Sequence, residues 1–204
     1  MNKTNNAASS PAIALQLPPL PDLAVSDVIA PAYAWPGQAI DLSWTTINQG
    51  AIPPGRPWTE TVLISADPAI TPAQSLLSIT ITTPLAAGQF LVQTQRVALP
   101  PAATAGEYYL AIRTDAAETL IEAVEANNLG AATNTTRIAS ILTLQIPARQ
   151  IAENASDPIL RATVSHNGNP ANPVLVTITN SDPSELTMPD QVEIPAGQNS
   201  ASFD

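Results

Sequence analysis

The sequence has no cysteine and few charged or aromatic side chains, at 12% and 4% of its 204 residues. Without cysteine the chain has no disulfides, no thiolate metal ligands and no cysteine nucleophile, which excludes thiol redox chemistry. No apolar run reaches the roughly 18 residues of a membrane span, so we expect no membrane insertion. We expect no nucleic acid partner either, because 17 acidic against 7 basic residues give a net charge of -10, which repels phosphate.

The inventory of catalytic side chains is equally short. The only histidine, His166, lies in Ser-His-Asn-Gly, which is typical of an exposed turn, and no Gly-x-Ser-x-Gly motif accompanies it. Glu118, Glu122 and Glu125 could supply a pair of carboxylates, but glycoside hydrolysis needs a defined separation across a bound sugar, and the sequence indicates no pocket for one. We therefore expect that the chain is not an enzyme.

Short β-patterned segments between turn residues make up most of what is present. Residues 1–20 are polar and then proline-rich, which predicts a stiff, extended leader. Beyond the leader, eight strands are predicted: Leu23–Ile29, Ala39–Ile47, Trp58–Ser65, Ser75–Thr82, Phe90–Leu99, Glu107–Thr114, Thr119–Val124 and Ala131–Ile138. Eight strands in about 120 residues is the spacing of a β-sandwich.

A second unit is predicted over residues 141–204. Its strands are Ile141–Ile146, Pro158–Val164, Val174–Thr179, Gln191–Ile194 and Ser200–Phe203. A sandwich usually has about seven strands in about 100 residues, so we expect this one to be truncated. Its unpaired sheet edge could associate with a second copy of the chain.

Two aromatic residues are predicted to build the first sandwich. Trp44 alternates with polar neighbours, as do Ile40 and Leu42, which places these three side chains on the core face of one sheet. Tyr108 enters its strand after Leu99-Pro-Pro and Gly106, as in the tyrosine corner of Greek-key sandwiches, where the hydroxyl binds upstream backbone. Both residues are therefore interpreted as architectural.

Four separated motifs in the first unit agree with one known family. They are Pro21-Asp-Leu-Ala-Val25, Ile40-Asp-Leu-Ser-Trp44-Thr-Thr-Ile-Asn48-Gln-Gly50, Trp58 to Asp67, and Gly106-Glu-Tyr-Tyr-Leu110 leading to Asp115 and to Glu122 through Asn128. Together they resemble the CARDB domain, a cell-adhesion-related module of bacterial proteins, over about residues 21–139.

Residues 141–204 are similar to the opening part of a Calx-beta repeat. The resemblance depends on Ile151-Ala-Glu153-Asn, on Ser181-Asp-Pro-Ser-Glu185-Leu-Thr and on Val192-Glu-Ile-Pro-Ala-Gly197-Gln. It implies calcium binding through acidic residues at one end of the sandwich, with Glu153 as the matching glutamate. Both resemblances imply an all-β protein of two tandem immunoglobulin-like sandwiches, used outside the cell and not as an enzyme.

The strongest candidate site is the acidic stretch near residue 120. Calcium needs several converging oxygens, which Asp115, Glu122, Glu125, Asn127 and Asn128 could provide from a hairpin. On a regular strand Glu122 and Glu125 would face opposite sides, so a shared site requires a bulge or a turn between them. In the alternative interpretation, the two asparagines only end a strand by bonding neighbouring backbone groups.

The sequence thus predicts a non-catalytic adhesion or spacer module of a larger bacterial protein, secreted or on the cell surface. Its expected partners are a protein or glycan on another surface and neighbouring repeats of the same chain, and calcium is the only cofactor expected. The alternative is an ancillary domain of a secreted hydrolase whose catalytic domain lies outside this chain.

Overall fold

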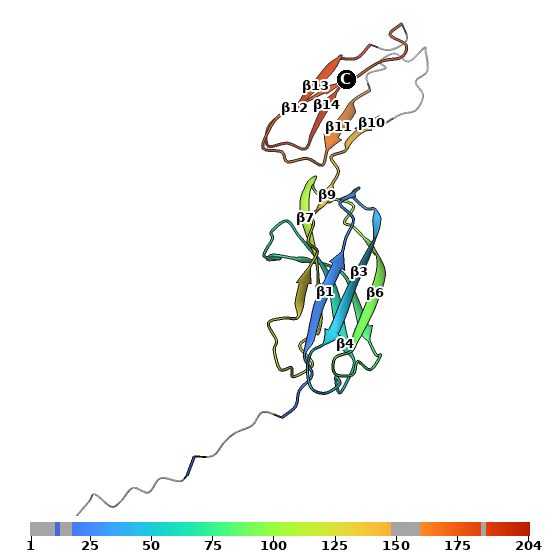
Figure 1. Cartoon of the computed structure of the whole chain (residues 1–204). Helices are drawn as coiled ribbons and strands as arrows, with labels where there is room; N and C mark the ends of the chain where they lie inside the picture. The colour runs from blue at the N-terminus through green and yellow to red at the C-terminus, as the bar shows by residue number, and fades with distance from the viewer. Residues whose placement is uncertain (1–10, 13–17, 148–159, 185–186) are drawn as a thin grey trace, which may run out of the picture.

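Alternating side chains and frequent turn residues produce strands throughout the chain. In a computed structural model, which describes residues 11–12, 18–147, 160–184 and 187–204, every regular element is a β-strand, so the all-β prediction is confirmed (Figure 1). The first unit contains β1 (Leu23–Ile29), β2 (Tyr33–Ala34), β3 (Ala39–Asn48), β4 (Trp58–Ser65), β5 (Gln74–Ile81), β6 (Phe90–Ala98), β7 (Gly106–Arg113), β8 (Leu129–Ala131) and β9 (Thr136–Ile138). The second contains β10 (Leu142–Gln145), β11 (Ala162–His166), β12 (Val174–Thr177), β13 (Gln191–Ile194) and β14 (Ser200–Phe203).

The first unit is built from two sheets. One has the order β1-β3-β6, and the other has the order β2-β9-β7-β4-β5 with β8 also paired to β7. All pairs are antiparallel except β2 with β9, which run parallel with Tyr33 opposite Arg137 and Ala34 opposite Ile138. In β3 every second side chain is buried, and Trp44 is 1% exposed, as its alternation predicted.

A buried glutamate joins the two sheets across this core. Glu60 of β4 is 1% exposed, and its carboxyl group accepts hydrogen bonds from Trp44 Nε1 (2.7 Å), Thr46 Oγ1 (2.6 Å) and Trp58 Nε1 (3.2 Å). Because a buried polar group is costly without a partner, one carboxyl group that satisfies two indoles and a hydroxyl stabilises the core. The burial of Glu60 was not predicted from the sequence.

The corner before β7 has the predicted form. The Tyr108 hydroxyl donates to the carbonyl oxygen of Thr104 at 3.0 Å, four residues upstream. This bond fixes the chain as it enters β7, whose Leu110 and Ile112 are fully buried. The architectural interpretation of Tyr108 is confirmed.

Two predicted strands of the first unit are wrong. Residues 119–124 form a loop, because their backbone and side chains are engaged by Asp115 and Glu125 and not by a neighbouring strand. The predicted strand Ala131–Ile138 is divided into β8 and β9, with a bend at residues 133–134 between them. The short strand β2 was not predicted.

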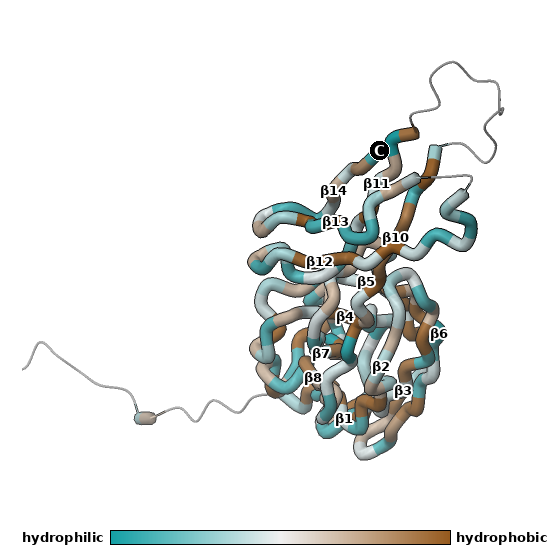
Figure 2. The backbone as a smooth tube through the Cα atoms, turned by 90° about the horizontal axis from the view of Figure 1, so that it is seen from above, coloured by the Kyte–Doolittle hydropathy of each residue, from teal (hydrophilic) through white to brown (hydrophobic). Residues whose placement is uncertain are grey.

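The second unit also has two small sheets, β10-β11-β14 and β12-β13. Its core consists of Val164, Val176, Val192 and Ile194. Figure 2 shows hydrophobic residues along β10, yet Leu142 and Leu144 of this edge strand are 57% and 47% exposed. Part of the predicted strand Pro158–Val164 lies outside the described residues.

His166 is not the exposed turn residue that its local sequence predicts. It ends β11 opposite Leu142, is 9% exposed, and its Nδ1 accepts a hydrogen bond from the Gly168 N–H at 2.9 Å. The prediction was wrong because pairing with β10 extends the strand to His166, whose alternation with Val164 then turns its side chain inward.

Asn167 connects the two units. Its side chain accepts from Ile141 N–H (2.8 Å) and donates to the carbonyl oxygens of Ala139 (2.9 Å) and Ala103 (3.2 Å). Its own carbonyl oxygen accepts from Ala105 N–H at 2.7 Å. One residue of the second unit is therefore bonded both to the linker and to the loop before β7. In the described residues, no helix could cross a membrane.

Candidate functional site

The acidic stretch lies at one end of the first sandwich, in the loop of residues 114–128 that joins β7 to β8. We call this segment the acidic loop. Its two ends are held together by a backbone hydrogen bond from Thr114 N–H to the Asn128 carbonyl oxygen at 2.9 Å. The loop is therefore an extension of the β7-β8 pairing, and its first and last side chains are neighbours.

Asp115 shapes the first half of the acidic loop. It is 1% exposed, with one carboxylate oxygen accepting from Thr119 N–H and Thr119 Oγ1, and the other accepting from Leu120 N–H at 2.9 Å. Its backbone has a φ of 38°, in the left-handed region that aspartate tolerates better than most residues. The Asp115 carboxylate therefore stabilises the turn of residues 115–120 through hydrogen bonds within the loop.

Glu122 ties the acidic loop to the first strand. One carboxylate oxygen accepts from Leu23 N–H in β1 at 2.6 Å, and the other accepts from Asn128 Nδ2 at 2.9 Å. The side chain is buried, and burial raises the pKa of the Glu122 carboxyl above its ordinary value. Hydrogen bonds from Leu23 and Asn128 lower this pKa, whereas the nearby charges of Glu125 and Asp115 raise it.

The chain bends at residue 123, between Glu122 and Glu125, and turns at residues 126–127 before Asn128. Within this segment, Glu125 accepts a hydrogen bond from Glu122 N–H at 3.1 Å. The asparagines do not bond neighbouring backbone through their side chains: Asn127 Nδ2 donates to Asp22 at 2.8 Å, and Asn128 Nδ2 donates to Glu122. The alternative interpretation therefore named the wrong partners for both asparagines.

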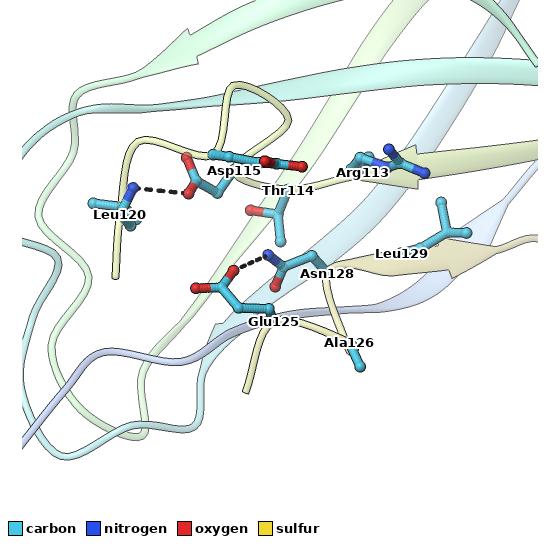
Figure 3. Close-up of a pocket in the computed structure, with 9 residues that line it drawn as sticks. Arg113, Thr114, Asp115, Leu120, Glu125, Ala126, Asn128 and Leu129 are labelled. Atoms are coloured by element: carbon cyan, nitrogen blue, oxygen red, sulfur yellow. Dashed lines mark hydrogen bonds between the residues drawn. The ribbon is translucent and has the colours of Figure 1, made fainter. Parts of the chain in front are cut away.

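A cavity of about 600 Å³ lies inside the acidic loop (Figure 3). It is lined by Arg113, Thr114, Asp115, Glu118, Leu120, Glu125, Ala126, Asn128 and Leu129. Two buried oxygen atoms of this lining, Thr114 Oγ1 and Asn128 Oδ1, have no hydrogen-bond partner in the part of the chain that the structure describes. The same is true of Asn127 Oδ1, nearby in the sequence. In Figure 3 the side chains of Thr114 and Asn128 lie near the Glu125 carboxylate, which the Asn128 amide nitrogen faces.

The structure thus gathers Asp115, Glu122, Glu125, Asn127 and Asn128 into one hydrogen-bonded loop, while Glu153 lies outside the described residues. Among the residues described, no three acidic or histidine side chains converge in a way that could hold a metal ion. Sequence reasoning missed Thr114 and Asp22. The sequence could have indicated them only by position, because Asp22 directly precedes β1 and Thr114 directly follows β7, next to the cluster.

A two-sheet sandwich with a sealed core, a tyrosine corner and a structured loop at one end defines an immunoglobulin-like β-module. The CARDB family model matches residues 20–132, so the chain belongs to the CARDB family. CARDB domains are non-catalytic modules of the adhesion type. No curated protein sequence matches the chain.

Solved structures similar to this chain include a CARDB domain from Pyrococcus furiosus, determined in complex with di-metal ions. It is 18% identical, with a TM-score of 0.44, and the match covers 59% of this chain and 90% of that one. A beta-glucosidase 3B from Thermotoga neapolitana in complex with alpha-D-glucose is 14% identical, with a TM-score of 0.37, and the match covers 55% of this chain and 16% of that one.

Proposed function

We propose that this chain is an adhesion or spacer segment of a larger bacterial protein that is secreted or held at the cell surface. Membership of the CARDB family is the observation that carries the proposal. The partner would be a protein or a glycan on another surface. The proposal holds with or without calcium at the acidic loop.

The interior of the first unit supports a mechanical role. Its two sheets enclose a continuous apolar core that includes Leu42, Trp44, Leu110 and Ile112, all at most 1% exposed. Within that core Glu60 accepts hydrogen bonds from Trp44, Thr46 and Trp58, so these polar groups are occupied by one another. Such an interior suits a module that keeps its shape and presents its surface.

A binding experiment tests the adhesive role. The labelled full chain is applied to an array of glycans and to immobilised extracellular matrix proteins, with the heat-unfolded chain as the control. Saturable binding that requires the folded chain is the expected result. Turnover of a glycoside or peptide substrate by the chain alone would contradict the non-catalytic proposal.

The alternative is an ancillary domain of a secreted hydrolase. It shares the non-catalytic role and differs only in what the rest of the protein does, so the sequence beside this segment distinguishes the two. Tandem repeats favour the adhesion protein, and a protease or glycosidase domain favours the ancillary role. The Calx-beta resemblance of residues 141–204 stays a prediction that the same sequence would test.

Contact with a neighbouring repeat or a second copy is also proposed, through β10. This edge strand presents Leu142 and Leu144 on the side that carries Val164 in the adjacent strand, and no residue of β10 is charged. Size-exclusion chromatography with light scattering tests it: the full chain should associate and Leu144→Lys should not. Leu175→Lys, at an exposed leucine of β12, is the matched control.

A further inference from the structure

We propose that the cavity of the acidic loop is a cation site that takes calcium through Thr114 Oγ1, Asn128 Oδ1 and the Glu125 carboxylate. The inference depends on two oxygen atoms without partners and not on the proposed adhesive function. It also differs from the calcium set predicted from the sequence: Thr114 is added, and only Glu125 and Asn128 of the predicted ligands are kept.

Thr114 supplies the first oxygen of the proposed site. Thr114 is 0% exposed and lines the cavity, and its hydroxyl has no hydrogen-bond partner among the described residues. A buried hydroxyl almost always finds a partner in a native protein, and one that lacks a protein partner indicates a bound water or ion. The hydroxyl could have served a backbone carbonyl of its own loop, but it points into the cavity instead (Figure 3).

Asn128 supplies the second oxygen from the facing strand end. The backbone bond from Thr114 N–H to Asn128 O makes these two residues cross-strand neighbours, so their side chains project together. Because Asn128 Nδ2 already donates to Glu122, its Oδ1 is the atom that remains buried and unpaired. Both orphan atoms are therefore oxygens, the ligand type that calcium prefers.

Three carboxylates, those of Asp115, Glu118 and Glu125, line the cavity against the single guanidinium of Arg113, so the charge around it favours a cation over a neutral water. The ion pairs found among the described residues are Arg96 with Asp41 and Arg161 with Asp204, and neither includes a carboxylate of the acidic loop. Glu125 is exposed, and its carboxylate accepts a long hydrogen bond, 3.5 Å, from Asn128 Nδ2. It is therefore free to turn one oxygen to a cation, while Asp115 and Glu122 stay bonded to backbone and add negative potential.

One carboxylate and two neutral oxygens would leave the remaining positions of a calcium ion to water, which calcium accepts in flexible geometry. This arrangement agrees with the finding that no three acidic or histidine side chains among the described residues form a metal group. A site of this kind depends on neutral ligands, so loss of the Thr114 hydroxyl should weaken it.

The test uses calcium chloride on the full chain, followed by calorimetric titration and thermal melting, with EGTA as the calcium-free reference. We expect saturable binding and a rise in Tm of about 5 °C at a calcium concentration a hundredfold above Kd. Thr114→Val should keep the Tm measured in EGTA and weaken calcium binding by about tenfold. Thr114→Ser, which keeps the hydroxyl, should retain the response.

Glu125→Gln provides a second variant at an exposed position, and Glu193→Gln on β13 is its control, since it removes one exposed carboxylate from the second unit. Glu125→Gln should weaken calcium binding and Glu193→Gln should not. The proposal is overturned if calcium leaves the melting of the native chain unchanged, which would assign a water to the orphan oxygens. It is also overturned if all variants respond alike, which would indicate general screening of the negative charge.

Discussion

Trp44 donates its indole N–H to the carboxyl group of Glu60 across the two sheets of the first unit, at 2.7 Å. Replacing Glu60 by Leu removes the acceptor for Trp44, Trp58 and Thr46 together. We expect a loss of about 3 kcal/mol or more in the free energy of unfolding, because three buried donors lose their partner. Urea denaturation followed by tryptophan fluorescence measures it. Glu60→Gln keeps one acceptor and should cost less; equal stability of Glu60→Leu and the native chain would contradict this role.

Gly50 is required by a close approach of two backbone segments. A Cβ at this position would lie 2.5 Å from Asp22 N and closer still to the Leu20 carbonyl oxygen. Gly50→Ala should therefore destabilise the chain by roughly 2 kcal/mol or more, since backbone must move. At Gly55 an added Cβ would contact nothing, so Gly55→Ala should change stability by less than about 0.5 kcal/mol. Similar melting temperatures for the two variants would refute the explanation.

Asn167 should determine how firmly the two units are joined. Asn167→Ala removes the side-chain hydrogen bonds to Ile141, Ala139 and Ala103. We expect faster cleavage of the linker around residue 140 by proteinase K, because local opening becomes easier. Asn169→Ala is the control, as Asn169 is exposed and bonds only Ala171 of its own loop. Equal cleavage rates would show that Asn167 does not hold the junction.

The raised pKa of Glu122 predicts that the chain is stabilised at low pH. Because the pKa of the folded Glu122 carboxyl lies above its ordinary value of 4.5, the folded state holds more protons than the unfolded state as pH rises above 4.5. The contribution of Glu122 to the free energy of unfolding is therefore fully present below about pH 4.5 and is lost as the pH rises through the pKa of the folded state. Melting of the native chain and of Glu122→Gln between pH 4 and 7 measures it. The native chain should gain relative to the variant at low pH, and parallel curves would count against the shift.

The strands of the first unit were predictable because strand periodicity is local. Trp44 and Tyr108 could be placed from their neighbours alone, and both placements are confirmed. The burial of Glu60 was not predicted, although alternation from Trp58 places its side chain on the inner face, because a charged side chain is seldom buried without partners. The structure supplies those partners in the indole N–H groups of Trp44 and Trp58.

The conformation of the acidic loop was harder to predict from the sequence because it depends on hydrogen bonds to residues far away in the chain. Glu122 bonds Leu23, 99 positions earlier, and Asn127 bonds Asp22, 105 positions earlier. Residues 119–124 have the composition of a strand, yet these contacts hold them in a loop. Local patterns cannot indicate such partners, and the same is true of His166, whose burial depends on pairing with β10.

The parallel pairing of β2 with β9 determines how the first unit would respond to a pull along the chain. Backbone hydrogen bonds join Arg137 N–H to the Ala32 carbonyl oxygen and Ala139 N–H to the Ala34 carbonyl oxygen, both at 2.9 Å. Once β1 has been pulled away from β3, tension applied through the two ends of the unit would drag β2 and β9 in opposite directions along their length. Both hydrogen bonds then bear the load in shear at the same time and cannot open one after the other. The β2-β9 pair should therefore resist extension most strongly when the linker after β9 is pulled away from the N-terminal end of the unit.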